Sequence, residues 1–219
     1  MRDAPSQANL FRQLNNPSLE HELAWLRPLR SSVSRIANFG CWKGDEPFAL
    51  LGTLGAIEVT VIEIDKNYLA NLEKKIADFS EARLLDRCSI TPVLGDMTSV
   101  QLRGDYYDLA YCDEVLYSVF EESEQNLQVA IDKMISVVRS GGWIIAVETK
   151  IGAEVQEVEN QLLSALSGQK IVQHIPVSDP IDISPLFEAA GLVKINLDGA
   201  PKWSYCYMKP NRPPNPHWS

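Results

Sequence analysis

The sequence lacks the marks of a secreted or membrane-bound protein. Its four cysteines lie far apart and form no Cys-x-x-Cys pair: they are Cys41, Cys88, Cys112 and Cys206. This spacing is typical of the reduced, buried thiols of a cytosolic protein. No stretch approaches the roughly 20 apolar residues that span a bilayer. The N-terminal residues hold no apolar segment long enough for a signal peptide. We therefore expect a cytoplasmic protein without a membrane partner.

Basic residues and histidines are also scarce. Lys and Arg number 20 against 29 Asp and Glu, which gives a net charge of −9. Nucleic acids bind proteins through concentrated Lys and Arg, so we expect no nucleic-acid partner. The three histidines, His21, His174 and His217, form no cluster with cysteine, and we expect no metal site. The sequence gives no indication of the oligomeric state.

The residues that are present predict one globular α/β domain. Of the 219 residues, 45% are hydrophobic and 22% are charged, and the length suffices for a sizeable core. From Ser34 onward, short apolar runs alternate with longer segments of helical periodicity, which is typical of a parallel sheet covered by helices. The expected strands are 34–39, 59–64, 89–94, 108–112 and 143–148. We expect a helical cap at 1–33, the main domain at 34–209 and a Pro-rich tail at 210–219.

Two apolar stripes predict helices between these strands. The first stripe covers 69–79, and Asp65 stands in front of it as an N-cap. The second covers 127–138 and runs toward Gly141-Gly142, which we interpret as the stop signal of that helix.

The residues beyond 150 predict a different arrangement. A helix at 155–166 and a polar loop with His174 lead to a short helix at 183–190. Two strand-like runs, 193–197 and 204–208, are joined by an Asp-Gly-Ala-Pro turn. This pattern predicts an antiparallel hairpin that closes the sheet.

The first strand leads into a glycine loop, the run Asn-Phe-Gly-Cys-Trp-Lys-Gly at 38–44. Glycines at a strand-to-helix turn let the backbone approach a ligand, and the following helix offers free N–H groups. The second strand ends at Glu63, which lies 23 residues after Gly40. A carboxylate at that place can accept hydrogen bonds from both ribose hydroxyls of a nucleoside. Simpler roles are a tight turn for the glycines and a helix cap for Glu63.

Two further loops end at the same edge of the predicted sheet. After the third strand, Asp96 is suited to accept a hydrogen bond from an adenine amino group, and Met97 to pack on the ring. The fourth strand delivers Asp113 and Glu114, which could also be solvated loop acids. Because ligands of open α/β sheets bind outside the carboxyl ends of the strands, we expect these loops to converge on one crevice.

The order and spacing of these motifs resemble the class I S-adenosylmethionine-dependent methyltransferases over about residues 34–208. The resemblance implies an α/β fold: a Rossmann-like, mostly parallel seven-stranded sheet with helices on both faces and a C-terminal antiparallel hairpin. It also implies an enzyme that moves the methyl group of S-adenosyl-L-methionine to a small-molecule acceptor and leaves S-adenosyl-L-homocysteine. The implied cofactor-binding residues are Asn38, Gly40, Cys41, Gly44, Glu63, Ile64, Asp96, Met97 and Asp113. The catalytic candidates are Asp113 and His174.

Two residues depart from the pattern of that family. Asn38 stands where an acidic residue is usual, and Trp42 replaces the middle glycine of the loop. One alternative is therefore a non-catalytic protein that binds S-adenosylmethionine or S-adenosylhomocysteine in a degenerate site. The run Gly-Asp-Glu-Pro-Phe at 44–48 is similar to one in chemotaxis receptor glutamate methyltransferases, so another alternative is methylation of a protein side chain. A nucleotide-dependent oxidoreductase fits less well, because Trp42 also replaces the second glycine of Gly-x-Gly-x-x-Gly.

Overall fold

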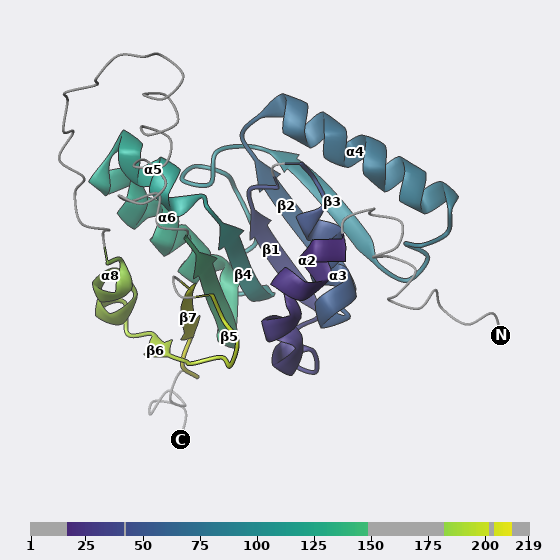
Figure 1. The fold of residues 1–219 in the computed structure, drawn as a ribbon. Coiled ribbons are helices and arrows are strands. Elements are labelled where there is room, and N and C mark those ends of the chain that lie inside the picture. The colour runs from purple at the N-terminus through teal and green to yellow at the C-terminus, as the bar shows by residue number, and fades with distance from the viewer. Residues whose placement is uncertain (1–16, 42, 149–181, 202–203, 212–219) are drawn as a thin grey trace, which may run out of the picture.

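Seven strands form one sheet (Figure 1). They are β1 (Arg35–Phe39), β2 (Glu58–Glu63), β3 (Ser89–Leu94), β4 (Tyr107–Asp113), β5 (Val138–Val147), β6 (Val193–Lys194) and β7 (Ser204–Met208). The computed structural model describes residues 17–41, 43–148, 182–201 and 204–211. The strand order is β3-β2-β1-β4-β5-β7-β6; β1 to β5 pair in parallel, and β7 pairs antiparallel with both β5 and β6. This topology confirms the predicted Rossmann-like sheet with its C-terminal antiparallel strands.

Helices cover both faces of the sheet (Figure 1). One face carries α2 (Pro17–Glu22), the 3-10 helix η1 (Ala24–Leu29), α3 (Glu46–Leu54) and α4 (Lys66–Glu81); the other carries α5 (Leu116–Glu122), α6 (Glu124–Val137) and α8 (Ser184–Ala189). Successive strand residues point to opposite faces, so each face has its own hydrophobic cluster. Tyr111 of β4 belongs to the cluster with α3 and α4, and Cys112 belongs to the cluster with α6 and α8.

The N-terminal helices pack into the first of these clusters. Trp25, Leu26 and Leu29 of η1 are buried together with Phe48 of α3. The Phe48 ring in turn packs on Phe79 of α4, with ring centroids 4.3 Å apart. This packing fixes α2 and η1 against α3 and so places α2 next to the carboxyl ends of the central strands.

The glycine pair after α6 corrects one prediction. α6 passes directly into β5 at Val138, so Gly141-Gly142 lies inside a strand and does not stop a helix. Gly141 has a φ of +73°, and a Cβ on Gly142 would lie 2.9 Å from the carbonyl oxygen of Asp108. The register of β4 against β5 shifts near this point. The glycines therefore serve an irregular and close approach of two strands.

Most other local predictions agree with the structure. Asp65 caps α4, because its carboxylate accepts a hydrogen bond from the backbone N–H of Asn67 over 2.7 Å. β6 is shorter than the predicted strand at 193–197. The helix expected at 155–166 and residues 212–219 of the tail lie outside the described residues. Within the described ranges, no helix is both long enough and apolar enough to cross a membrane.

Candidate functional site

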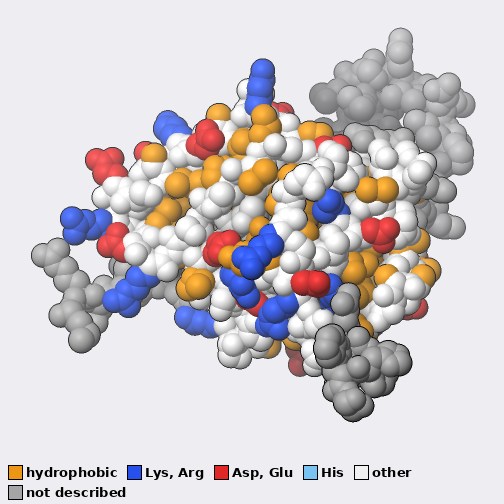
Figure 2. Space-filling view, turned by 180° about the vertical axis from the view of Figure 1, so that it is seen from behind, with side chains coloured by type: hydrophobic (Ala, Val, Ile, Leu, Met, Phe, Trp, Pro, Cys, Tyr) orange, Lys and Arg blue, Asp and Glu red, His pale blue; other side chains and the backbone are white. Residues whose placement is uncertain are grey.

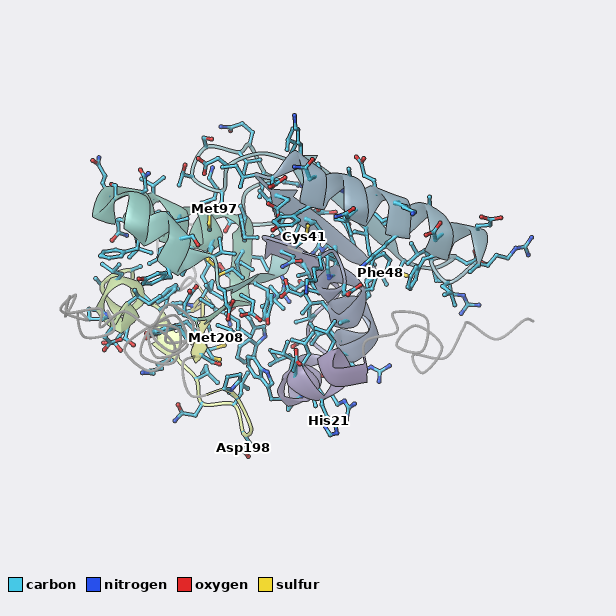
Figure 3. The ribbon with its side chains drawn as sticks, turned by 45° about the horizontal axis from the view of Figure 1, so that its top comes forward. His21, Cys41, Phe48, Met97, Asp198 and Met208 are labelled. Carbon is cyan, nitrogen blue, oxygen red and sulfur yellow. The ribbon has the colours of Figure 1, made fainter. Side chains whose placement is uncertain are left out.

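A cavity of about 840 Å³ lies at the carboxyl ends of β1 to β4. It is lined by most of the residues that the sequence predicts for the site: Gly40, Cys41, Glu63, Ile64, Asp96, Met97 and Asp113. Cys41 and Met97, which come from the loops after β1 and β3, are labelled in Figure 3. Asn38 and Gly44 lie behind this wall and do not line the cavity. Trp42 and the catalytic candidate His174 fall outside the described residues.

The two glycines of the loop, Gly40 and Gly44, have positive φ angles and pack closely against neighbouring elements. Gly40 has a φ of +82°, and a Cβ there would lie 2.7 Å from Cγ2 of Val115 in the loop after β4. Gly44 has a φ of +77°, and its Cβ would lie 3.2 Å from the Cα of Leu72 in α4. Both positions favour glycine for conformational reasons, but only Gly40 also faces the cavity.

Glu63 connects the end of β2 to the glycine loop. It is buried, and its Oε2 accepts a hydrogen bond from the backbone N–H of Cys41 over 2.9 Å. Its Oε1 accepts from the backbone N–H of Asp65, also over 2.9 Å. Each carboxylate oxygen has a further lone pair, so Glu63 retains acceptor capacity toward the cavity that it lines. The side chain thus orders the loop as well as facing a ligand.

The far end of the cavity combines one carboxylate with apolar side chains. Oδ1 of Asp96 accepts hydrogen bonds from the backbone N–H and the hydroxyl of Thr98, over 2.7 and 2.8 Å. These bonds fix the carboxylate in one orientation. Met97 beside it is buried, whereas Ile64 is 67% exposed. A flat apolar ring with a polar edge suits this surface.

Glu46, which lines the cavity in the first turn of α3, was not among the predicted site residues. Its Oε1 accepts a hydrogen bond from Nδ2 of Asn38 over 2.7 Å. Asn38 is completely buried, and its Oδ1 has no hydrogen-bond partner among the described residues. Burial, with the charge of Asp113 as the next cause, raises the pKa of Glu46 to about 8. In the sequence, Glu46 before Pro47 looks like an ordinary helix start, so only the fold reveals its pairing with Asn38.

Asp113 at the end of β4 stands among other carboxyl groups. Burial is the largest cause that raises its pKa to about 6, followed by the charges of Glu114 and Glu22. Glu22 reaches the cavity from α2, which belongs to the segment predicted as the N-terminal cap. A carboxyl group with such a pKa can accept a proton near neutral pH.

Glu148, directly after β5, fixes the helix that follows β4. Its two oxygens accept hydrogen bonds from the backbone N–H groups of Leu116 and Tyr117, over 2.9 and 3.2 Å, at the start of α5. Burial outweighs these bonds and, together with the charges of Asp113 and Glu114, raises the pKa of Glu148 to about 7. The carboxyl groups at this edge therefore form one electrostatically coupled group.

The thiol of Cys41 does not contribute nucleophilic chemistry. Burial, followed by the neighbouring charge of Glu63, raises its pKa to about 12. A thiol with that pKa stays protonated at neutral pH and is a poor nucleophile. Cys41 therefore serves the site through its backbone N–H, which Glu63 holds.

Comparison with known proteins gives the family. The family model described as a methyltransferase domain matches residues 37–146, half of the chain, and the chain belongs to this family. Among solved structures, the N-methyltransferase NodS from Bradyrhizobium japonicum WM9 is similar with a TM-score of 0.55 and 19% identity, covering 91% of this chain and 98% of that one. The PH0226 protein from Pyrococcus horikoshii OT3 is similar with a TM-score of 0.61 and 15% identity, covering 90% and 94%. At these identities the likeness concerns the fold. No curated protein sequence matches the chain.

Proposed function

We propose that this protein is an S-adenosylmethionine-dependent methyltransferase that acts on a small molecule. The observation that carries the proposal is that one cavity joins the glycine loop at Gly40, the buried carboxylate of Glu63 and the Asp96-Met97 pair. The carboxylates suit ribose hydroxyls and an adenine amino group, and Met97 suits the face of the ring. α2 supports a small acceptor, because Leu19 and Glu22 border the same cavity next to Asp113.

The residues present fit the amino-acid end of this cofactor. Oδ1 of Asn38 is a buried acceptor that has no partner within the described ranges, and Glu46 beside it carries a carboxyl group that faces the cavity. Glu46 supplies the acceptor for an ammonium group and takes over the role of the acid that residue 38 lacks, while Asn38 holds it from behind. Gly40 lets the glycine loop pack against Val115, because a Cβ there would lie 2.7 Å from the Cγ2 of Val115. When bound, the cofactor supplies a methyl group on a good leaving group, and the protein contributes orientation, exclusion of water and a base.

The first test compares the two glutamates at opposite ends of β2 by calorimetry with S-adenosylhomocysteine. Glu63→Gln replaces one acceptor oxygen at the cavity and is expected to raise Kd at least about tenfold, equivalent to about 1.4 kcal/mol. Glu58→Gln is the matched control, since Glu58 accepts a hydrogen bond from Tyr106 away from the cavity. Equal, small effects of both substitutions would contradict the ribose role of Glu63, and absence of binding to the wild type would overturn the proposed function.

A second ligand separates Glu46 from Glu63. 5′-Methylthioadenosine contains the adenosine and sulfur of the cofactor but lacks its amino-acid end. Glu46→Gln should weaken S-adenosylhomocysteine about tenfold and leave 5′-methylthioadenosine unchanged, whereas Glu63→Gln should weaken both. An equal loss for the two ligands in Glu46→Gln would show that Glu46 acts through the loop structure and not by contact with the ammonium group.

A further inference from the structure

One wall of the cavity comes from a single stretch of chain, which runs from the end of β4 into α5. Five residues of this stretch line the cavity: Asp113, Glu114, Val115, Ser118 and Val119. The contacts that fix this stretch therefore also fix the shape of that side of the cavity.

The chain leaves β4 through a backbone conformation that needs support from outside the stretch. Glu114 has a φ of +56°, in the left-handed region that residues other than glycine rarely adopt. Its N–H donates a hydrogen bond to the carbonyl oxygen of Val147 in β5 over 2.8 Å. Such conformations persist where the surrounding structure enforces them, and they concentrate at functional sites. The end of β5 thus supplies the first contact that holds the wall.

Glu148, the next residue along the chain, supplies the second contact. Its Oε1 accepts a hydrogen bond from the N–H of Leu116 over 2.9 Å, and its Oε2 accepts one from the N–H of Tyr117 over 3.2 Å. The side chain is half-buried and is not among the residues that line the cavity. Any effect of Glu148 on a ligand must therefore pass through the stretch that it holds.

A third contact joins this wall to the glycine loop. A Cβ on Gly40 would lie 2.7 Å from Cγ2 of Val115, so the two loops pack against each other without room for a side chain at residue 40. Val115 directly precedes α5. A shift at the start of α5 would therefore also move the surface on which the glycine loop rests.

The hold of Glu148 depends on its charge. Both carboxylate oxygens accept hydrogen bonds when the group is ionised, whereas protonation turns one of them into a donor that faces an N–H group. Glu148 faces Asp113 and Glu114 after β4, Cys112 within β4 and Tyr205 of β7. Burial, opposed by the two N–H groups and followed by the charges of Asp113 and Glu114, raises its pKa to about 7. The carboxyl group therefore changes its charge near neutral pH.

We propose that Glu148 is a positioning residue of the site: its ionised carboxylate keeps the loop after β4 in the shape that binds the cofactor, and its protonation releases that loop. This inference rests on the proposed function for the identity of the ligand and adds a control of its binding. Two simpler roles predict different results. A plain helix cap would affect stability without a pH-dependent effect on binding, and a charge acting through space would affect only a charged ligand.

The first experiment needs no ligand. The backbone amide signals of Leu116 and Tyr117 are followed by NMR in the wild-type protein labelled with nitrogen-15, between about pH 5 and pH 9. We expect both signals to move with one midpoint near pH 7, because their acceptor gains its charge there. The amide of Ser184 is the internal control, since it donates to Asp182 over 2.9 Å and this bond lowers the pKa of Asp182.

The same titration of Glu148→Gln identifies the group responsible. In this variant both amide signals should stay constant through neutral pH. Constant signals in the wild type, or movement that persists in Glu148→Gln, would overturn the proposal. The wild-type titration decides this point even if the variant does not fold.

The second experiment measures binding by calorimetry at pH 8 and pH 6. The ligands are S-adenosylhomocysteine and 5′-methylthioadenosine, which is uncharged at both pH values. Glu148→Gln should raise Kd for both ligands about fivefold at pH 8 and less than about twofold at pH 6, where most of the wild type is protonated at this residue. Glu58→Gln is the matched control and should change neither value, because Glu58 is also half-buried and hydrogen-bonded, to Tyr106, but lies away from the cavity.

The pattern across ligands and pH values separates the possible roles. An equal loss of affinity at pH 6 and pH 8 would show that Glu148 is only a structural cap, and the proposal would be wrong. A loss confined to S-adenosylhomocysteine would contradict it as well, since Glu148 would then act by its charge and not by position. Absence of binding of both ligands to the wild type would instead refute the proposed function, while the amide titration would still decide whether Glu148 holds the loop.

Discussion

Two aspartates at opposite ends of β4 have opposite environments. Asp108, at the start of the strand, accepts hydrogen bonds from the backbone N–H groups of Ser34 and Arg35, over 2.9 and 2.8 Å, and pairs with the side chain of Arg139. Burial alone would raise the pKa of Asp108, but Arg139 and these N–H groups lower it below its ordinary value. Asp113, at the end of the same strand, has a pKa of about 6 among other carboxyl groups.

The difference separates charged residues that stabilise the fold from charged residues that line the cavity. At the amino ends of the strands, acids and bases neutralise each other; Lys209 likewise pairs with Asp105 over 2.7 Å. Seen from behind, Lys and Arg side chains gather in the lower middle of the molecule with Asp and Glu side chains among them (Figure 2). At the carboxyl ends, like charges face one another around a cavity. Proteins retain such unfavourable local arrangements mainly at functional sites.

The largest expected effect comes from removing the paired aspartate. Asp108→Ala leaves two backbone N–H groups and Arg139 without their carboxylate, and we expect a loss of about 3 kcal/mol in the free energy of unfolding. Urea denaturation followed by circular dichroism measures this loss. Asp105→Asn is the control, because Asp105 is exposed and should change stability by less than about 1 kcal/mol. Equal effects of the two substitutions would show that the Asp108 cluster is no more than a surface ion pair.

The pH dependence of stability should follow the other set of carboxyl groups. Asp113, Glu148 and Glu46 have pKa values of about 6, 7 and 8, above the ordinary values of 3.8 and 4.5. Between these ordinary values and about pH 8, the folded state therefore binds more protons than the unfolded state, and stability falls as pH rises. We expect the free energy of unfolding to be higher at pH 6 than at pH 8 by about 2 kcal/mol.

Each of the three carboxyl groups has several polar or charged neighbours that influence its pKa. Asp113 faces Glu22, Glu114 and Tyr111; Glu46 faces Asn38, Asp113 and Glu114; Glu148 faces the start of α5, Asp113 and Glu114. Glu46→Gln, which removes the group with the highest of these pKa values, should reduce the slope between pH 6 and 8. Asp108, whose pKa is lowered, stabilises the fold by a constant amount above its ordinary value of 3.8 and changes the pH dependence only below that value, where its stabilisation is lost. A wild-type protein that becomes more stable from pH 6 to pH 8 would contradict the raised pKa values.

The sequence predicted the sheet well because strand patterns are local. The alternating or continuous apolar runs and the Asp65 cap depend on neighbouring residues, and both appear in the structure. Gly141-Gly142 was misinterpreted because a helix stop and a strand irregularity use the same residue type. The structural reason for the second glycine is the carbonyl of Asp108 on another strand, which no local pattern contains.

The sequence predicted those site residues whose position follows from the order of the strands. The ends of parallel strands meet at one edge, so Glu63, Asp96 and Asp113 could be placed there from the sequence. Glu46 and Glu22 could not, because their roles depend on how α3 and α2 pack over that edge. The pairing of Asn38 with Glu46 joins residues eight positions apart across a loop, a spacing that is not typical of a helix or a strand.

The smallest effect, and the sharpest contrast with Asp108, is expected at the other end of the same strand. Asp113→Asn removes a charge that Glu22 and Glu114 repel, while the amide keeps the shape of the side chain. We expect the free energy of unfolding at pH 8 to increase by about 1 kcal/mol, and the gain to shrink below pH 6 and vanish only below pH 3.8, where the carboxyl is protonated in both the folded and the unfolded state. The same urea titrations above and below pH 6 measure it. A loss of stability at pH 8 would mean that Asp113 has a favourable partner in the folded protein and supports the fold as Asp108 does. A gain at pH 8 together with lost methyl transfer would show that Asp113 lowers stability and serves function, whereas Asp108 stabilises the fold.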